Sequence, residues 1–212
     1  MRAGRRAPFV PLRAPSRVIR QSSSLTWSHA MSPWDRPHRN TYWVLSDRLL
    51  AGEYPGADDP EETHEKLDSF LASGFTRFLD LTEPHEKPPY DALLLELASK
   101  RALNVMHRRH PIPDVSVPTD RQHMTAILRQ IDEWLGDEHR VYVHCRGGIG
   151  RTGMVIGCYL VQSGHDGEGA LRRLQELWAT VGEAKRWCFP RIPQTVEQEN
   201  YIRNWRTDGV SG

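Results

Sequence analysis

Hydrophobic positions follow two alternating patterns between residues 41 and 206. Short runs rich in aliphatic and aromatic side chains predict strands, whereas apolar positions three or four residues apart predict amphipathic helices. We expect strands at 42–45, 48–52, 77–81, 102–107 and 140–145, the first two forming a pair. We expect helices at 60–73, 90–100, 119–135, 150–163, 167–180 and 194–206. Strands that alternate with helices predict an α/β domain.

The first 40 residues differ in composition from the rest. They hold eight arginines and one acidic residue, Asp35, and they show no apolar periodicity. Such a segment buries too little apolar surface to offset its ordering entropy, so we expect residues 1–40 to be disordered. Three interpretations stay open: a transit peptide, a basic arm for anionic surfaces, or a start site that belongs at Met31. We expect residues 41–206 to form the folded domain and residues 207–212 a flexible C-terminus.

Length and composition restrict the class of protein further. A chain of 212 residues, 38% of them hydrophobic, suffices for one sizeable core and therefore one domain. No run of about 18 apolar residues occurs, so we expect no membrane span. A net charge of +1 argues against a nucleic-acid partner. Three cysteines without a close pair argue against a disulfide framework or a zinc site, and they predict a cytoplasmic protein.

Residues 144–153 read HCRGGIGRTG and carry the clearest chemistry of the chain. The run before them predicts a strand and the run after them predicts a helix, so the glycine-rich loop lies at a helix N-terminus. Unpaired backbone N–H groups and the helix dipole favour an anion there, and the glycines allow a close approach. The predicted phosphate-binding residues are Arg146, Gly147, Gly148, Ile149, Gly150 and Arg151.

Four side chains of this motif predict phosphoryl transfer. The N–H donors that would hold a phosphate also stabilise a thiolate at Cys145, which would attack phosphorus. The planar guanidinium of Arg151 is suited to hold two phosphoryl oxygens. Thr152 offers a hydroxyl to the thiolate, and His144 is expected to order the loop. The alternative is an inert buried cysteine beside a glycine-rich turn.

His144, Cys145, Arg151 and Thr152 match the signature HC-x5-R-[ST]. In these residues the chain resembles the class I cysteine-based protein tyrosine phosphatases, in particular their dual-specificity branch. The resemblance implies the fold of that superfamily, a central mixed and mainly parallel sheet flanked by helices in a single catalytic domain. It also implies that no cofactor and no metal ion take part. We further expect a monomer.

The family uses a general acid on a loop upstream of the nucleophile. Asp114, within HPIPDVSVP at 110–118, is the candidate. The segment resembles the family's W-P-D-x-G-x-P loop, but Ile112 replaces the Trp and Ser116 replaces the Gly, which is closer to the dual-specificity branch. The alternative is a turn aspartate without chemistry. Asp120 is a second candidate, although its position also suits a helix start.

A third segment, PQTVEQ at 193–198, resembles the Q-T-x-x-Q loop of tyrosine phosphatases. In that loop a glutamine positions the water that hydrolyses the phosphocysteine, so Gln194 or Gln198 would serve here. The same residues also suit an ordinary helix opening capped by Thr195.

Several residues outside these segments are expected to have structural roles. Cys158 lies on an apolar helix and is expected in the core, with a resolving thiol for oxidised Cys145 as the alternative. Cys188 lies between two aromatic residues and is expected to pack with them. The basic segment 107–110 is expected to be a solvated turn near the acid loop.

Taken with the resemblance, these residues predict a metal-independent phosphomonoesterase that acts on phosphotyrosine or mixed phosphoproteins through a phosphocysteine. The alternative substrates are phosphoinositides or small phosphate esters. The lipid alternative is weakened because Arg146 is basic but Ile149 is not. A phospho-ligand-binding domain without turnover is the non-enzyme alternative. The chain lacks a K-N-R-Y motif, which argues against the tyrosine-specific branch.

Overall fold

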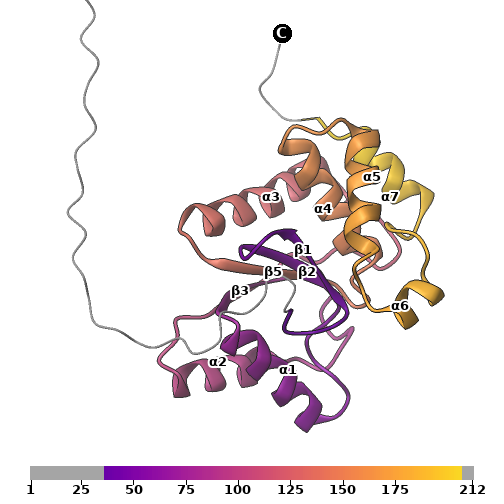
Figure 1. Ribbon diagram of the computed structural model, residues 1–212. Helices are drawn as coiled ribbons and strands as arrows, with labels where there is room; N and C mark the ends of the chain where they lie inside the picture. The colour runs from indigo at the N-terminus through magenta and orange to yellow at the C-terminus, as the bar shows by residue number, and fades with distance from the viewer. Residues whose placement is uncertain (1–35, 207–212) are drawn as a thin grey trace, which may run out of the picture. The chain divides into compact units, whose positions relative to one another are not determined.

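The computed structural model describes residues 36–206; expectations for residues 1–35 and 207–212 fall outside this part of the chain. Within it, five strands form one sheet (Figure 1). They are β1 (Thr41–Leu45), β2 (Leu49–Gly52), β3 (Phe75–Asp80), β4 (Met106–Arg109) and β5 (Arg140–His144). The helices are α1 (Pro60–Ala72), α2 (Asp91–Lys100), α3 (Arg121–Gly136), α4 (Gly150–Gln162), α5 (Gly167–Trp178), α6 (Glu183–Cys188) and α7 (Val196–Arg203).

The order of strands in the sheet is β1-β2-β5-β3-β4. β1 and β2 are antiparallel, whereas the other neighbouring pairs are parallel. His144 at the end of β5 lies opposite Gly52 of β2 and Asp80 of β3. Three parallel strands therefore end at the same edge, with β5 in the middle. The predicted mixed, mainly parallel α/β fold is confirmed.

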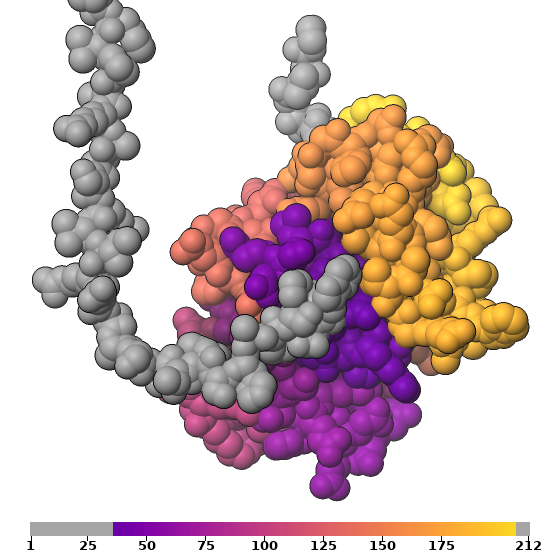
Figure 2. Space-filling view, viewed as in Figure 1, coloured from indigo at the N-terminus to yellow at the C-terminus, as the bar shows by residue number. Residues whose placement is uncertain are grey.

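Helices cover both faces of the sheet (Figure 1). α1 and α2 lie on one face, where Phe70 contacts Phe78 and Tyr142 of the sheet. α3, α4, α5 and α7 lie on the other face, and their side chains form the larger of the two buried clusters. In Figure 2 the indigo surface of β1 and β2 lies between the orange surface of α5 and the purple surface of α1.

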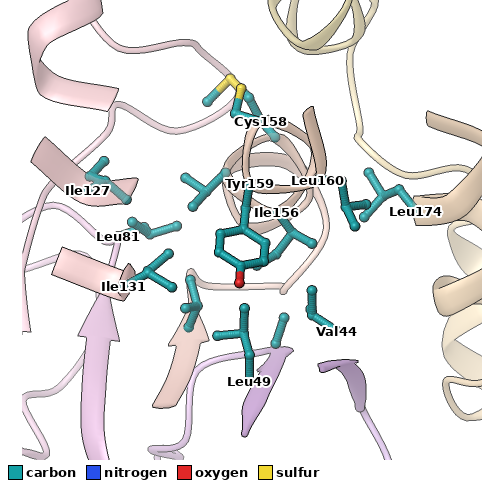
Figure 3. Packing of buried hydrophobic residues seen from close by; sticks show 14 of the residues in the cluster. Val44, Leu49, Leu81, Ile127, Ile131, Ile156, Cys158, Tyr159, Leu160 and Leu174 are labelled. Atoms are coloured by element: carbon teal, nitrogen blue, oxygen red, sulfur yellow. The ribbon is translucent and has the colours of Figure 1, made fainter. Parts of the chain in front are cut away.

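The larger cluster is built around α4, whose residues are almost all buried (Figure 3). Tyr159 and Ile156 face the strand side chain of Leu49. Cys158 is fully buried on the side of the helix away from Leu49, so its predicted place in the core is confirmed. Burial raises the pKa of the Cys158 thiol, which keeps it protonated at neutral pH.

The sequence-based elements differ from the structure in two places. The run 102–107 predicted a strand, but the strand begins at Met106, because Leu103 and Val105 pack against the cluster under α1 and α2. Helix α6 was not predicted. Cys188 is exposed and Trp187 is 85% exposed, so the expectation that Cys188 packs with its neighbours was wrong.

Residues 36–40 contact the folded domain. The Arg36 guanidinium donates to the Thr180 carbonyl (2.7 Å), and Ser69 Oγ of α1 donates to the Pro37 carbonyl (2.9 Å). The Gly182 N–H donates to the Arg39 carbonyl (3.1 Å). Residues 36–40 are therefore part of the folded domain, which begins before the expected boundary at residue 41. Between residues 36 and 206, no helix is both long and apolar enough to cross a membrane.

Candidate active site

The segment 145–149 connects the central strand β5 to α4 at the edge where three strands end. Cys145 is 3% exposed, and its Sγ accepts a hydrogen bond from the Gly148 N–H (3.2 Å). The Tyr54 N–H donates to the Arg146 carbonyl (3.1 Å), which fixes one side of the loop on the residues after β2. The loop thus brings backbone N–H groups and the start of α4 to the sulfur, the arrangement that stabilises an anion.

Gly148 is the residue of this loop whose conformation most needs glycine. Its φ is +72°, and a Cβ there would lie 2.3 Å from the Gly52 carbonyl carbon and 2.6 Å from the Glu53 nitrogen. The loop is therefore seated directly on the backbone at the end of β2. The neighbouring atoms of Gly52 and Glu53 belong to the backbone, so they cannot make room for a Cβ by changing a side-chain rotamer.

Arg151 lies in the first turn of α4 and is 1% exposed. Its Nη1 and Nη2 donate to the two carboxylate oxygens of Glu86 (2.7 and 2.6 Å), and Nη1 also donates to the Ile112 carbonyl (3.1 Å). Burial lowers the pKa of Arg151, but the hydrogen bonds to Glu86 and the nearby negative charges outweigh it and raise the pKa above the ordinary value. Burial also opposes the charge of Glu86, yet the hydrogen bonds from Arg151 lower the pKa of Glu86. Both groups are therefore charged at neutral pH.

Three buried polar atoms of the predicted site residues have no hydrogen-bond partner within residues 36–206: Nε of Arg151, Oγ1 of Thr152 and Nδ1 of His144. Of these three residues, Arg151 lines a cavity. A buried donor without a partner costs about 1–3 kcal/mol, so such atoms at a cavity indicate a place for a bound group. Nε of Arg151 is free for an anion, whereas its terminal nitrogens are engaged by carboxylates.

Asp114 lies at the mouth of the same cavity. Its Oδ1 is 2.8 Å from Nη2 of Arg151, and its side chain is 47% exposed. The next residue, Val115, has φ +58°, which is strained for a β-branched side chain. The segment 110–118 therefore brings a half-exposed carboxyl next to the buried arginine.

These residues surround a cavity of about 350 Å³. Eight of the predicted site residues line it, together with Phe189, which was not predicted. The eight are Asp114, Cys145, Arg146, Gly147, Ile149, Gly150, Arg151 and Gln194. Gly148 does not line the cavity; it packs on the backbone of Gly52 and Glu53, and its N–H donates to Cys145 Sγ.

The structure separates the two candidate glutamines. Gln194 lines the cavity, whereas Gln198 is fully buried. Oε1 of Gln198 accepts from the Gln194 and Thr195 N–H groups, and its Nε2 donates to the Ser116 carbonyl (3.0 Å). Thr195 caps α7 in a reciprocal arrangement with Gln198. Gln198 thereby connects the acid segment to the start of α7.

His144 lies below the loop and is fully buried. Its Nε2 is hydrogen-bonded to the Tyr90 hydroxyl (2.6 Å), and its Nδ1 is 3.8 Å from Asp80 Oδ1. Burial lowers the pKa of His144 to about 4, against the attraction of Asp80, so the ring is neutral at pH 7. Arg109 pairs with Asp80 (2.8 Å), and His107 lies 3.4 Å from the same carboxylate. The expectation of a solvated basic turn at 107–110 was therefore wrong, because residues 107–109 belong to β4.

Two residues of the site were not found from the sequence: Glu86, which pairs with Arg151, and Phe189, which lines the cavity. Glu86 lies in a polar segment after β3 that has the composition of a surface loop, and its pairing spans 65 positions. Phe189 follows helix α6, which was not predicted. The sequence could have pointed to it only through its position five residues before Gln194, which lines the same cavity. Among the described residues, no three His, Cys, Asp or Glu side chains form a group that could hold a metal ion.

The chain is similar to known phosphatases. The model of the family described as "Polymorphic toxin system, DSP-PTPase phosphatase" matches residues 55–165. "Putative tyrosine phosphatase 067L" of Invertebrate iridescent virus 3 is 30% identical over 124 residues, which are 57% of this chain and 45% of that protein. Cyclin-dependent kinase inhibitor 3 of Sus scrofa is 28% identical over 115 residues, 53% of this chain and 48% of that protein. The chain thus spans less than half the length of these two relatives.

A solved structure of Tk-PTP in its active form has a TM-score of 0.53 and 27% identity, and the likeness covers 77% of this chain and 94% of that chain. Kinase associated phosphatase gives a TM-score of 0.56 at 20% identity, which shows the fold alone. The matched segment 55–165 contains both the acid segment and the phosphate-binding loop. The chain therefore belongs to the dual-specificity and tyrosine phosphatase family, within the group described as DSP-PTPase phosphatases of polymorphic toxin systems.

Proposed function

We propose that this chain is a metal-independent phosphomonoesterase that hydrolyses phosphoproteins through a phosphocysteine intermediate. The observation that carries the proposal is that Cys145 and the buried Arg151 line one cavity, where Nε of the arginine has no partner in the described chain. A phosphoryl group could accept hydrogen bonds from Nε of Arg151 and from the backbone N–H groups of the loop. The thiolate of Cys145, at the start of the same loop, would attack its phosphorus.

The first step would form a phosphorus–sulfur bond and break the bond between phosphorus and the leaving oxygen. The Cys145 thiolate supplies the electron pair, and Asp114 gives its proton to the leaving oxygen. Binding of the phosphoryl group at Arg151 would take the place that Asp114 occupies against Nη2, which frees the carboxyl for the leaving group. Arg151 and the loop amides stabilise the charge on the three equatorial oxygens.

The second step would consume one water and release inorganic phosphate. Asp114, now a carboxylate, takes a proton from the water that attacks phosphorus, and the phosphorus–sulfur bond breaks to restore the thiolate. The Thr152 hydroxyl would donate to the departing sulfur, and Gln194 at the cavity wall would hold the water. Gln198 would keep the acid segment and Gln194 in register.

The test is turnover of p-nitrophenyl phosphate in the presence of EDTA, followed by rapid acid quench to trap phosphocysteine. Cys145→Ser is expected to abolish turnover, and Cys188→Ser, which changes an exposed cysteine away from the cavity, is the matched control. Undiminished turnover in Cys145→Ser would refute the proposal. A panel of phosphopeptides, phosphoinositides and small phosphate esters then ranks the substrate classes.

A further inference from the structure

An aromatic side chain lies at the mouth of the phosphate cavity, on a part of the chain distant from the nucleophile. Phe189 follows α6 and lines the cavity together with Cys145 and Arg151, yet it is 41% exposed. An exposed aromatic ring in a cavity wall leaves apolar surface in water that a ligand can cover.

The backbone at Phe189 is fixed even though its side chain is exposed. The Phe189 carbonyl accepts a hydrogen bond from the indole N–H of Trp178 (2.8 Å), a side chain that is 1% exposed. The Phe189 N–H donates to the Lys185 carbonyl (2.9 Å), and Gln175 of α5 donates to the Pro190 carbonyl (3.0 Å). The backbone that carries the ring is therefore held in place by side chains of α5 and by α6, which lowers the entropy that binding would cost.

Further apolar side chains are exposed next to residues of the cavity wall. Val115 is 50% exposed and follows Asp114, and Val196 is 69% exposed and lies two residues after Gln194. Exposed apolar groups around a polar pocket fit a ligand with a charged end and an apolar body.

We infer that Phe189 is a specificity-determining residue whose ring packs against the ring of an aryl phosphomonoester such as phosphotyrosine. The inference rests on the proposed function for the position of the phosphoryl group. With that group on the loop at Arg151, an aryl ring extends toward the mouth and covers Phe189. An alkyl ester such as phosphoserine has a single methylene after its oxygen and no ring to cover the wall. Phe189 thus favours aryl over alkyl substrates, in a chain without the K-N-R-Y motif.

Binding and turnover are tested separately on the full chain. Calorimetry measures the affinity for phenylphosphonate and for ethylphosphonate, neither of which can be hydrolysed. Initial rates are measured on two peptides of one sequence that carry phosphotyrosine or phosphoserine. The variants are Phe189→Ala, Phe189→Leu, which keeps apolar bulk without a ring, and the control Trp187→Ala, which removes an exposed aromatic outside the cavity.

Phe189→Ala is expected to weaken phenylphosphonate binding about three- to tenfold and to raise KM for the phosphotyrosine peptide by a similar factor. Its affinity for ethylphosphonate is expected to stay within about twofold, because the alkyl group does not reach the ring. Phe189→Leu should fall between Phe189→Ala and the unsubstituted chain, and Trp187→Ala should match the unsubstituted chain.

Equal losses for the aryl and alkyl phosphonates, no loss for either, or the same loss in Trp187→Ala would overturn the inference. If the unsubstituted chain hydrolyses neither peptide but the phosphonate difference is present, the proposed phosphatase activity fails while the role of Phe189 stands. If both peptides are hydrolysed with no change in Phe189→Ala, the activity stands and the inference fails.

Discussion

The contact between Gly148 and the end of β2 gives a sharp prediction for the phosphate-binding loop. In Gly148→Ala the new methyl group would lie 2.3–2.6 Å from three backbone atoms, the C and O of Gly52 and the N of Glu53. The loop must therefore move away from β2. Because the Gly148 N–H donates to Cys145 Sγ, that movement also withdraws a donor from the sulfur.

The expected loss of stability has two parts. A left-handed conformation costs an alanine about 1–2 kcal/mol, and an overpacked methyl group costs about 1–3 kcal/mol more. The free energy of unfolding should fall by about 2–5 kcal/mol, which for a chain of this size lowers Tm by about 4–20 °C. Displacement of the loop, whose amides would hold the phosphoryl oxygens, should lower kcat about 100-fold, the loss expected when one oxyanion donor is removed.

Calorimetry and turnover of p-nitrophenyl phosphate measure the two effects. Gly147→Ala is the control for stability, since its Cβ meets only the Ile149 side chain at 3.4 Å. Gly136→Ala at the end of α3 meets nothing within 4 Å and is the control for activity. A Gly148→Ala chain that melts within about 2 °C of the unsubstituted chain and keeps its kcat would contradict the reasoning.

Three further predictions concern other residues of the site. Glu86→Gln removes a charged partner of Arg151 and should lower kcat/KM about 10- to 100-fold in steady-state assays; an unchanged value would mean that Glu86 does not hold the guanidinium. The pKa of His144 is about 4 when folded and near 6.5 when unfolded, so the unfolded chain takes up the proton first as pH falls. The contribution of His144 to the free energy of unfolding should be fully present above about pH 6.5 and should fall by about 3 kcal/mol toward pH 4. In urea unfolding, His144→Asn should show a smaller change of this free energy with pH between about pH 6.5 and 4. Gln194→Ala should show a burst of p-nitrophenol followed by slow turnover, whereas Gln198→Ala should lower kcat without a burst; the same trace in both variants would argue against their different placement.

Most of the strands and helices could be predicted from the apolar pattern within each segment. Strands β2 and β5 and helices α3 and α4 are continuous in sequence and show a clear period, so their existence followed from the apolar pattern. A strand at 102–107 was also predicted, but its bounds were wrong: β4 covers Met106–Arg109, where it pairs with β3 at the edge of the sheet. α6 has six residues and buries none of them, so it leaves no periodic trace.

At the site, Cys145 and Arg151 could be found because both lie in one short motif. The partner of the arginine could not, since Glu86 reaches Arg151 only through the fold. The left-handed backbone at Val115 was also hidden, because a β-branched residue gives no hint of positive φ. Phe189 was hidden for a third reason: its place at the cavity depends on the anchoring of its backbone by Trp178.

The hydrogen bond between Gln198 and the Ser116 carbonyl connects two segments that lie 82 residues apart in the sequence. Gln198 lies in the first turn of α7, which packs on α4 and α5, so the segment 110–118 is connected to the carboxyl-terminal part of the domain. Opening of that segment must break this connection or carry the start of α7 with it. Substitutions or ligands that shift α7 would therefore also shift Asp114 relative to the cavity. In the proposed mechanism, turnover would then depend on a surface remote from the phosphoryl group.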